Sequence, residues 1–195
     1  MQKIMLLSNN ENIKGLHEWL LQKGYEVKLC HEPLTLQTVE EFKPDLIISY
    51  NYRYIIKRDV IQHMGDAIIN LHISFLPWNK GADPNIWSFI DDTPKGVTIH
   101  RLEEGLDTGK IILQKKLEFD EEIETLASTY QKLNEEIVKL LMDHWEVIEK
   151  KHYIFKEQQG GGSSHKKSDL QGILKGKKID YEMTITQFKR FMENL

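Results

Sequence analysis

Short apolar runs alternate with amphipathic stretches through the first half of the chain. The apolar runs predict buried strands at Lys3–Ser8, Tyr25–Cys30, Leu46–Ser49 and Ala67–Leu71. Between them, apolar residues recur at helical spacing, which predicts helices over Ile13–Leu21, Leu36–Phe42 and Lys57–Met64. Strand and helix alternating in short units is typical of a parallel, Rossmann-like sheet.

The second half is less regular. A helix is predicted over Asn85–Asp91, strands over Gly96–Leu102 and Lys110–Phe119, and a closing helix over Ile185–Leu195. Residues 123–150 have helical spacing and predict one long amphipathic helix, or two helices separated by a kink. The chain is therefore read as an α/β fold, a mostly parallel sheet flanked by helices. We expect residues 1–155 to form the main domain and residues 156–195 to form a glycine-rich loop with a short C-terminal extension.

Composition excludes several classes of protein. With 40% hydrophobic and 29% charged residues in 195, the chain has the make-up of a single globular domain. Its net charge of −4 gives no field that favours nucleic acid, and no apolar run approaches the length of a membrane span. The single cysteine allows no internal disulfide, and the start shows no signal-peptide pattern, so a cytoplasmic location is expected.

Three polar residues alternate where the fourth predicted strand gives way to a turn. Asn70, His72 and Ser74 share one face of that strand because side chains alternate along it, and Pro77 follows. An amide, an imidazole and a hydroxyl at a strand end are typical of an α/β active site. The spacing alone leaves open that His72 is simply a hydrogen-bonded histidine at the end of a strand.

The amino-acid sequence of this stretch resembles that of a known family. The string N-L-H-I-S-F-L-P-W-N-K-G-A-D-P over Asn70–Pro84, with L-D-T-G over Leu106–Gly109, is similar to the signature of the folate-dependent formyltransferases. The resemblance implies a Rossmann-like formyltransferase fold and N10-formyltetrahydrofolate as co-substrate. No metal is implied, because the histidines show no ligand spacing with cysteine or carboxylate.

The resemblance also implies catalytic roles. Formyl transfer to an amine passes through a tetrahedral intermediate, so a site must stabilise an oxyanion and move protons. The amide of Asn70 suits the oxyanion, and His72 can donate to it or accept a proton from the amine. Asp107 is expected beside His72, where it sets the charge of the imidazole or relays protons, with burial raising its pKa.

Further residues are assigned by the same resemblance. The loop after the third strand and the loop that carries Asp107 are expected around the folate, through Tyr50, Tyr52, Arg53, Ile55, Leu102, Gly105 and Leu106. The motif loop and the glycine-rich stretch Gln158–Lys167 are expected near the acceptor, through Ser74, Trp78, Asn79, Lys80, Ser163 and His165. From its composition, the glycine-rich stretch can also be a simple linker. Lys80 stands where many relatives have arginine, which weakens any phosphate-gripping role at this position.

The expected acceptor is the amine of a nucleotide-linked amino sugar, such as a dTDP-4-amino-4,6-dideoxyhexose, in surface-polysaccharide synthesis. The turn after the first strand, Ser8–Asn12, lacks the glycines that cradle a phosphate, and a tRNA-binding module is not expected. Glycinamide ribonucleotide formyltransferase, a non-catalytic folate-binding domain and a formyl hydrolase remain alternatives. The aromatic residues expected at the surface are compatible with a homodimer.

Overall fold

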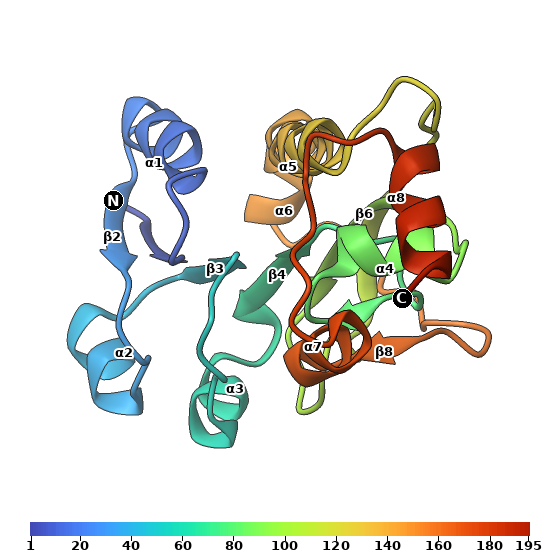
Figure 1. Ribbon diagram of the computed structural model, residues 1–195. Helices are drawn as coiled ribbons and strands as arrows, with labels where there is room; N and C mark the ends of the chain where they lie inside the picture. Colours follow the sequence, from blue (N-terminus) through green and yellow to red (C-terminus); the bar gives the residue numbers. More distant parts are fainter.

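A six-stranded sheet forms the centre of the protein in the computed structural model, which describes all 195 residues (Figure 1). The strand order is β2-β1-β3-β4-β6-β7. The pairs among β1 to β4 are parallel, whereas β6 runs antiparallel to both β4 and β7. The predicted mostly parallel sheet is confirmed. The strands are β1 (Lys3–Leu7), β2 (Glu26–Cys30), β3 (Leu46–Tyr50), β4 (Ile68–His72), β6 (Lys95–Arg101) and β7 (Ile111–Leu117).

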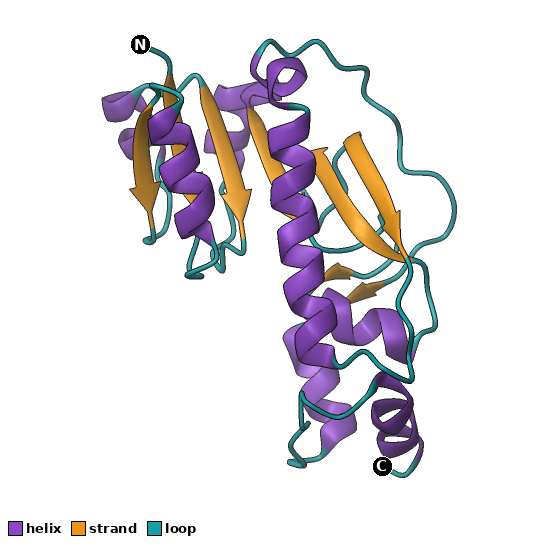
Figure 2. Ribbon diagram, turned by 90° about the horizontal axis from the view of Figure 1, so that it is seen from above, coloured by secondary structure: helices purple, strands orange, loops and turns teal.

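Helices cover both faces of the sheet, which explains why the central strands are continuous apolar runs. In β1, Ile4 and Leu6 join the core beneath α1, α5 and α6, whereas Met5 and Leu7 join the core beneath α2 and α3. Figure 2 shows α5 as the long helix near the middle of the molecule, in the layer that also contains α1 and α6. The helices of the two layers are α1 (Ile13–Gln22), α2 (Leu36–Phe42), α3 (Arg58–Met64), α5 (Leu126–Asp143) and α6 (Trp145–Glu149), and the 3-10 turn η1 (Gly65–Ala67) follows α3.

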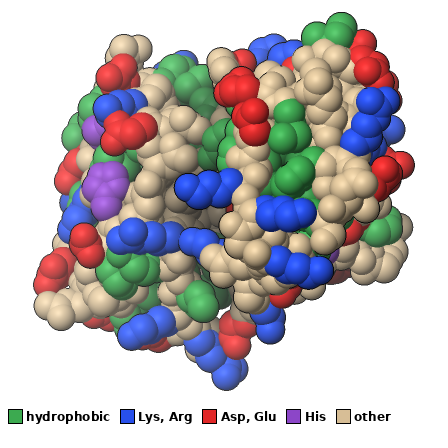
Figure 3. Space-filling view, in the orientation of Figure 1, with side chains coloured by type: hydrophobic (Ala, Val, Ile, Leu, Met, Phe, Trp, Pro, Cys, Tyr) green, Lys and Arg blue, Asp and Glu red, His purple; other side chains and the backbone are tan.

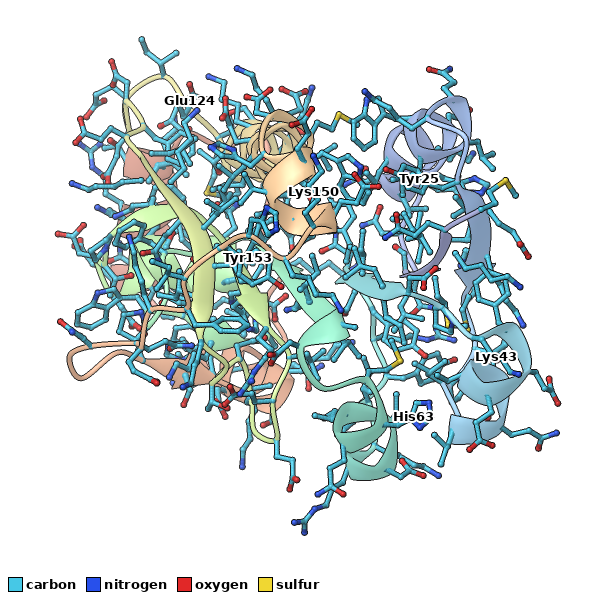
Figure 4. All side chains as sticks on the ribbon, turned by 180° about the vertical axis from the view of Figure 1, so that it is seen from behind. Tyr25, Lys43, His63, Glu124, Lys150 and Tyr153 are labelled. Carbon is cyan, nitrogen blue, oxygen red and sulfur yellow. The ribbon has the colours of Figure 1, made fainter.

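The long amphipathic stretch forms two helices, as one of the two sequence alternatives allowed. The first helix, α5, ends at Asp143, and the second, α6, begins after His144. Trp145 is buried, and its Nε1 donates a hydrogen bond to the hydroxyl of Tyr25 at 2.8 Å. Tyr25 donates in turn to Glu149 at 2.6 Å, so these two hydrogen bonds connect α6 to the residue just before β2. Tyr25 is labelled in Figure 4.

The C-terminal segment packs on a third apolar cluster, away from the two faces of the sheet. Ile86, Trp87 and Phe89 of α4 (Pro84–Ile90) contact Leu170 of α7 (Lys167–Leu174) and Phe188 of α8 (Ile185–Glu193). A two-stranded parallel sheet joins β5 (Lys80–Gly81) to β8 (Ser164–His165). The sequence did not predict α7, β5 or β8, and the division at residue 155 stays a prediction. No helix is both long enough and apolar enough to cross a membrane.

We expect Phe188→Ala to lower the free energy of unfolding by about 3–5 kcal/mol, because a fully buried aromatic ring is replaced by a cavity. Urea unfolding followed by circular dichroism measures this difference. Lys178→Ala, on the exposed segment between α7 and α8, is the matched control and should change it by less than about 0.5 kcal/mol. A loss below about 1 kcal/mol in Phe188→Ala would show that the third cluster does not contribute to the folded core.

Candidate active site

Strand β4 brings the first two candidate residues to one end of the sheet. Asn70 lies opposite His100 of β6, and His72 lies opposite Thr98, because these two strands pair antiparallel. Figure 3 shows this side of the molecule, with a hollow near its middle and Lys and Arg side chains around it. Comparison with Figure 1 places the hollow over β4.

The loop between β6 and β7 adds the carboxylate of Asp107. Asp107 has φ +49°, and two residues later a Cβ on Gly109 would lie 1.7 Å from the carbonyl oxygen of Arg101, so only glycine allows this close approach. Asp107 Oδ2 lies 3.6 Å from His72 Nδ1 and accepts the Gly81 N–H at 2.8 Å. The fold therefore brings the predicted aspartate beside the predicted histidine.

Asn70 lies between this carboxylate and a second histidine. Its Nδ2 is 3.2 Å from Asp107 Oδ1 and 3.2 Å from His100 Nε2. His100 Nδ1 is 2.8 Å from the carbonyl oxygen of Arg101 and must donate, since a carbonyl only accepts. In neutral His100 the other nitrogen, Nε2, is then an acceptor, and both amide hydrogens of Asn70 are engaged.

The sequence analysis did not identify His100 as a site residue, although it lies in a predicted strand. The ring is 1% exposed, and its Nε2 is 3.5 Å from Asp107 Oδ1. Only the pairing of β4 with β6 could have identified His100 as a site residue. An antiparallel register through Asn70 places His100 directly opposite, but that register follows from the tertiary fold.

His72 is buried and held in one tautomer. Its Nε2 is 3.1 Å from the carbonyl oxygen of Asn79, so Nε2 carries the hydrogen and Nδ1, facing Asp107, is free to accept a proton. Burial lowers the pKa of His72 below its ordinary value. The charge of Asp107 opposes this shift and His100 adds to it. The imidazole is therefore neutral at neutral pH.

Asp107 behaves differently from the sequence expectation. Burial alone would raise its pKa, as expected, but His72, His100 and the Gly81 N–H together hold the pKa of Asp107 below its ordinary range. The expectation of a raised pKa was wrong, because it considered burial and not the three partners. Asp107 is an ionised carboxylate facing an imidazole nitrogen, an arrangement that can accept a proton and pass it on.

An ion pair joins the two loops that are expected around the folate. Arg58 at the start of α3 forms a 2.9 Å ion pair with Glu104, which joins the loop after β3 to the loop that carries Asp107. Two apolar side chains of these loops face solvent, Ile55 at 93% and Leu106 at 51% exposed. Leu102 is half-buried, and Gly105 has φ +116°.

The three residues expected on the loop after β3 have different surroundings. The ring of Tyr50 is fully buried, and its hydroxyl donates to Asn134 Oδ1 at 2.7 Å, so its assignment as a folate contact is corrected to a core residue. The hydroxyl of Tyr52 donates to the carbonyl of Glu32, which leaves its ring half-buried at the surface. Arg53 is exposed and lies over the ring of Tyr54.

Two of the expected acceptor contacts are support residues instead. Asn79 is fully buried, and its Nδ2 donates to the hydroxyl of Thr93 at 2.7 Å. Ser74 is 3% exposed and donates to the carbonyl of Trp78 at 2.8 Å. Neither side chain is free to touch a substrate, which corrects both assignments. Trp78 and Lys80 are partly exposed and stay candidates.

The glycine-rich stretch returns to the site, as its family resemblance implied. Ser163 Oγ accepts the Asn79 N–H at 2.9 Å, and β8 pairs with β5 directly beside it. The ring of His165 stacks on Trp87 with centroids 3.7 Å apart, and its Nε2 lies 2.8 Å from Asp91. Ser163 and His165 are therefore near the site, held by protein partners. Contact of either with a substrate stays a prediction.

Solved structures of known proteins resemble this chain over nearly all of its length. A formyltransferase from Anoxybacillus kamchatkensis, PseJ, solved with UDP-4,6-dideoxy-4-formamido-L-AltNAc and tetrahydrofolate, is 41% identical. The match covers 95% of this chain and 96% of that chain with a TM-score of 0.87. An N-formyltransferase from Helicobacter canadensis, solved with folinic acid and dTDP-3-aminofucose, shares the fold. It has a TM-score of 0.78 at 20% identity, over 99% of this chain and 79% of that one.

Curated relatives match over a shorter stretch. Methionyl-tRNA formyltransferase of Ehrlichia ruminantium is 41% identical over 98 residues, which is 49% of this chain and 32% of that protein. The match thus spans about a third of the length of this relative. The family model described as formyl transferase matches residues 5–144, most of the chain and both strands that build the site. The chain belongs to the formyl transferase family.

Proposed function

We propose that this chain transfers the formyl group of N10-formyltetrahydrofolate to the amine of a nucleotide-linked amino sugar. The observation that carries the proposal is the buried, ionised Asp107 at 3.6 Å from a neutral His72, with Asn70 beside it. The acceptor class is supported by the 41% identical neighbour, whose structure holds a UDP-linked formamido sugar and tetrahydrofolate.

The proposed place of the donor is between the two loops that Arg58 and Glu104 join. Ile55 and Leu106 expose apolar side chains there, which suits one face of a flat pterin ring. The Lys and Arg side chains around the hollow suit the diphosphate of a nucleotide-linked sugar (Figure 3). Tyr52, Arg53 and Leu102 remain proposed donor contacts, and Trp78 and Lys80 remain proposed acceptor contacts.

The three polar residues divide the work of formyl transfer. As the acceptor nitrogen bonds to the formyl carbon it loses a proton, which Asp107 accepts directly or through His72 Nδ1. The proton then goes to the folate nitrogen as its bond to the formyl carbon breaks. Asn70 stabilises the oxyanion by moving one amide hydrogen from Asp107 or His100 to the reacting oxygen. No bound metal enters this scheme.

Glycinamide ribonucleotide is the weaker acceptor candidate. A phosphate cradle needs free backbone N–H groups in the turn after β1. Here the N–H groups of Asn9, Asn10 and Asn12 donate to the Asn51 carbonyl, to Ser8 Oγ and to Asn10 Oδ1. These three donors are already satisfied within the protein. This observation favours a sugar nucleotide over a ribonucleotide phosphate bound in that turn.

The finer assignments rest on the resemblance alone. A role in surface-polysaccharide synthesis, a cytoplasmic location and a homodimer stay predictions. The position of the amine on the sugar ring is also a prediction. The ligand of the 41% identical neighbour, a UDP-linked 4-formamido-4,6-dideoxy sugar, makes the corresponding 4-amine the first acceptor to test.

An acceptor panel tests the proposal. Purified protein with N10-formyltetrahydrofolate is offered UDP- and dTDP-linked 3- and 4-amino sugars and glycinamide ribonucleotide, and products are identified by mass spectrometry. We expect one amino sugar to be formylated and glycinamide ribonucleotide to be inert. Formylation of the ribonucleotide alone would replace the proposal by its alternative. Release of formate without a formylated product would make the protein a hydrolase, and binding of folate with no turnover would make it a non-catalytic folate-binding domain.

The pairing of His72 with Asp107 has a readout in pH. The charge of Asp107 raises the pKa of His72, so Asp107→Asn should move the titration midpoint of His72 to lower pH, further below 6.5. Imidazole NMR signals followed against pH measure the midpoint, with His72→Gln assigning the signal. In Asp107→Asn we also expect the rate of formyl transfer to fall by about 10²–10⁴. A midpoint that stays in place or rises would contradict the pairing.

The role of Asn70 is tested by Asn70→Ala, which removes the amide hydrogens and leaves His72 in place. If the amide stabilises the oxyanion, kcat should fall roughly 10²–10³-fold, with a smaller change in the KM of the acceptor. Steady-state kinetics measure both values. Asn79→Ala is the control, because it removes a buried amide that supports the site without a proposed role in the chemistry. A tenfold or smaller loss in Asn70→Ala would assign the oxyanion to another donor.

A further inference from the structure

The glycine-rich stretch joins the C-terminal segment to the site and is tied down at both ends. We call residues 156–165 the strap. At one end, Lys156 exchanges two backbone hydrogen bonds with Ile111, the first residue of β7, at 2.8 and 2.9 Å. At the other end β8 pairs with β5, and the Lys80 N–H donates to the Ser163 carbonyl at 3.0 Å. The part between these anchors crosses the catalytic loop.

Gln158 makes the contact with that loop. Its Nε2 donates to the carbonyl oxygens of Asp107 and Gly109, each at 2.8 Å. An amide nitrogen has two hydrogens, so both are used by the carbonyl groups of the two residues that flank Thr108. Its Oε1 is buried and has no hydrogen-bond partner. The side chain is oriented by the catalytic loop alone.

Side chains also hold this loop, through the Arg58–Glu104 ion pair and the bonds of the Asp107 carboxylate, but the backbone at its tip has no other hydrogen bond to the rest of the protein. Asp107 has φ +49°, a conformation that L-residues other than glycine seldom adopt. Glu104, Gly105 and Leu106 before it are exposed. Within the loop, Thr108 Oγ1 donates to the Glu104 carbonyl at 3.1 Å, which closes the turn but does not connect it to the rest of the protein. The two bonds from Gln158 make that connection on the backbone side.

The strap also reaches the support of His72. Ser163 Oγ accepts the Asn79 N–H at 2.9 Å and donates to Asn79 Oδ1 at 3.2 Å. The carbonyl of Asn79 in turn accepts the hydrogen on His72 Nε2. Gly162, with φ +65°, lies against Pro77, where a Cβ would be 2.3 Å from the carbonyl oxygen. The strap therefore follows a close-fitting path to this second contact.

We propose that Gln158 is a positioning residue for Asp107, and that the strap thereby sets the distance between the two catalytic groups, Asp107 and His72. This inference rests on the proposed catalytic role of Asp107. If the two donors of Gln158 are lost, the carbonyls of Asp107 and Gly109 turn to water and the loop carries the carboxylate to a range of positions. A displacement of about 1 Å at a reacting group can cost 10² in rate.

The test replaces Gln158 by methionine, which keeps the unbranched shape of the side chain and removes both donors. Gln159→Met, the same change at the exposed neighbouring position, is the matched control. We expect Gln158→Met to lower kcat about 10- to 100-fold with a KM for the acceptor within about threefold of the original. Gln159→Met should keep both values. Should Gln158→Met fail to fold, judged by circular dichroism, Gln158→Ala replaces it.

A second readout separates positioning from general weakening of the fold. Asp107 and His100 are the titratable groups that face His72, and Asp107 is the one that the strap holds. In Gln158→Met the NMR titration midpoint of His72 should therefore move to lower pH, by less than in Asp107→Asn. A lower kcat with an unchanged midpoint would overturn the proposal, as would an unchanged kcat.

The titration also keeps this proposal distinguishable from the proposed function. If the protein formylates no acceptor but the midpoint of His72 still moves in Gln158→Met, the proposed function fails and the positioning of Asp107 stands. If formyl transfer is found and neither kcat nor the midpoint responds, the function stands and the role of Gln158 is wrong.

Discussion

The structure of the site depends on one buried carboxylate. An ionised group removed from water costs several kcal/mol unless charges and hydrogen bonds replace its hydration. Asp107 accepts the Gly81 N–H and an amide hydrogen of Asn70, and its oxygens lie 3.6 Å from His72 Nδ1 and 3.5 Å from His100 Nε2. These partners lie on three different strands, so the carboxylate is stable only where β4, β5 and β6 converge. The proposed catalytic arrangement therefore depends on the meeting of these three strands.

The same convergence sets the protonation state of His72. With the Nε2 hydrogen given to the Asn79 carbonyl, the ring cannot turn without leaving a buried donor unpaired. Only Nδ1 remains to take a proton, and it faces Asp107. Desolvation keeps the ring neutral while its neighbours keep the carboxylate ionised. A neutral acceptor and a fixed anion side by side suit the removal of a proton from an attacking amine.

The sequence predicted the features of the fold that depend on residues close together in the chain. Apolar runs predicted strands buried on both faces, and the alternation of Asn70 with His72 placed both on one face of β4. Tyr50 and Asn79 were misassigned because their partners, Asn134 and Thr93, lie 84 and 14 residues away. The two-residue strands β5 and β8 exist only because they pair with each other, so neither leaves a pattern in its own residues. His100 was missed for the same reason, since a register is a property of two strands.

The glycine-rich stretch shows that composition alone does not reveal which residues a segment contacts. Glycines and serines in a row are typical of a flexible linker or of a loop that meets substrate. Here Gly162 fits closely against Pro77, and the side chains on either side of the glycines reach inward to the Asp107 loop and to Asn79. Asp107 and His72, the two proposed catalytic groups, are then held partly by residues about 50 to 90 positions further along the chain. A segment with that pattern of contacts belongs to the wall of the active site, and its small residues are what allow the backbone to pass so close.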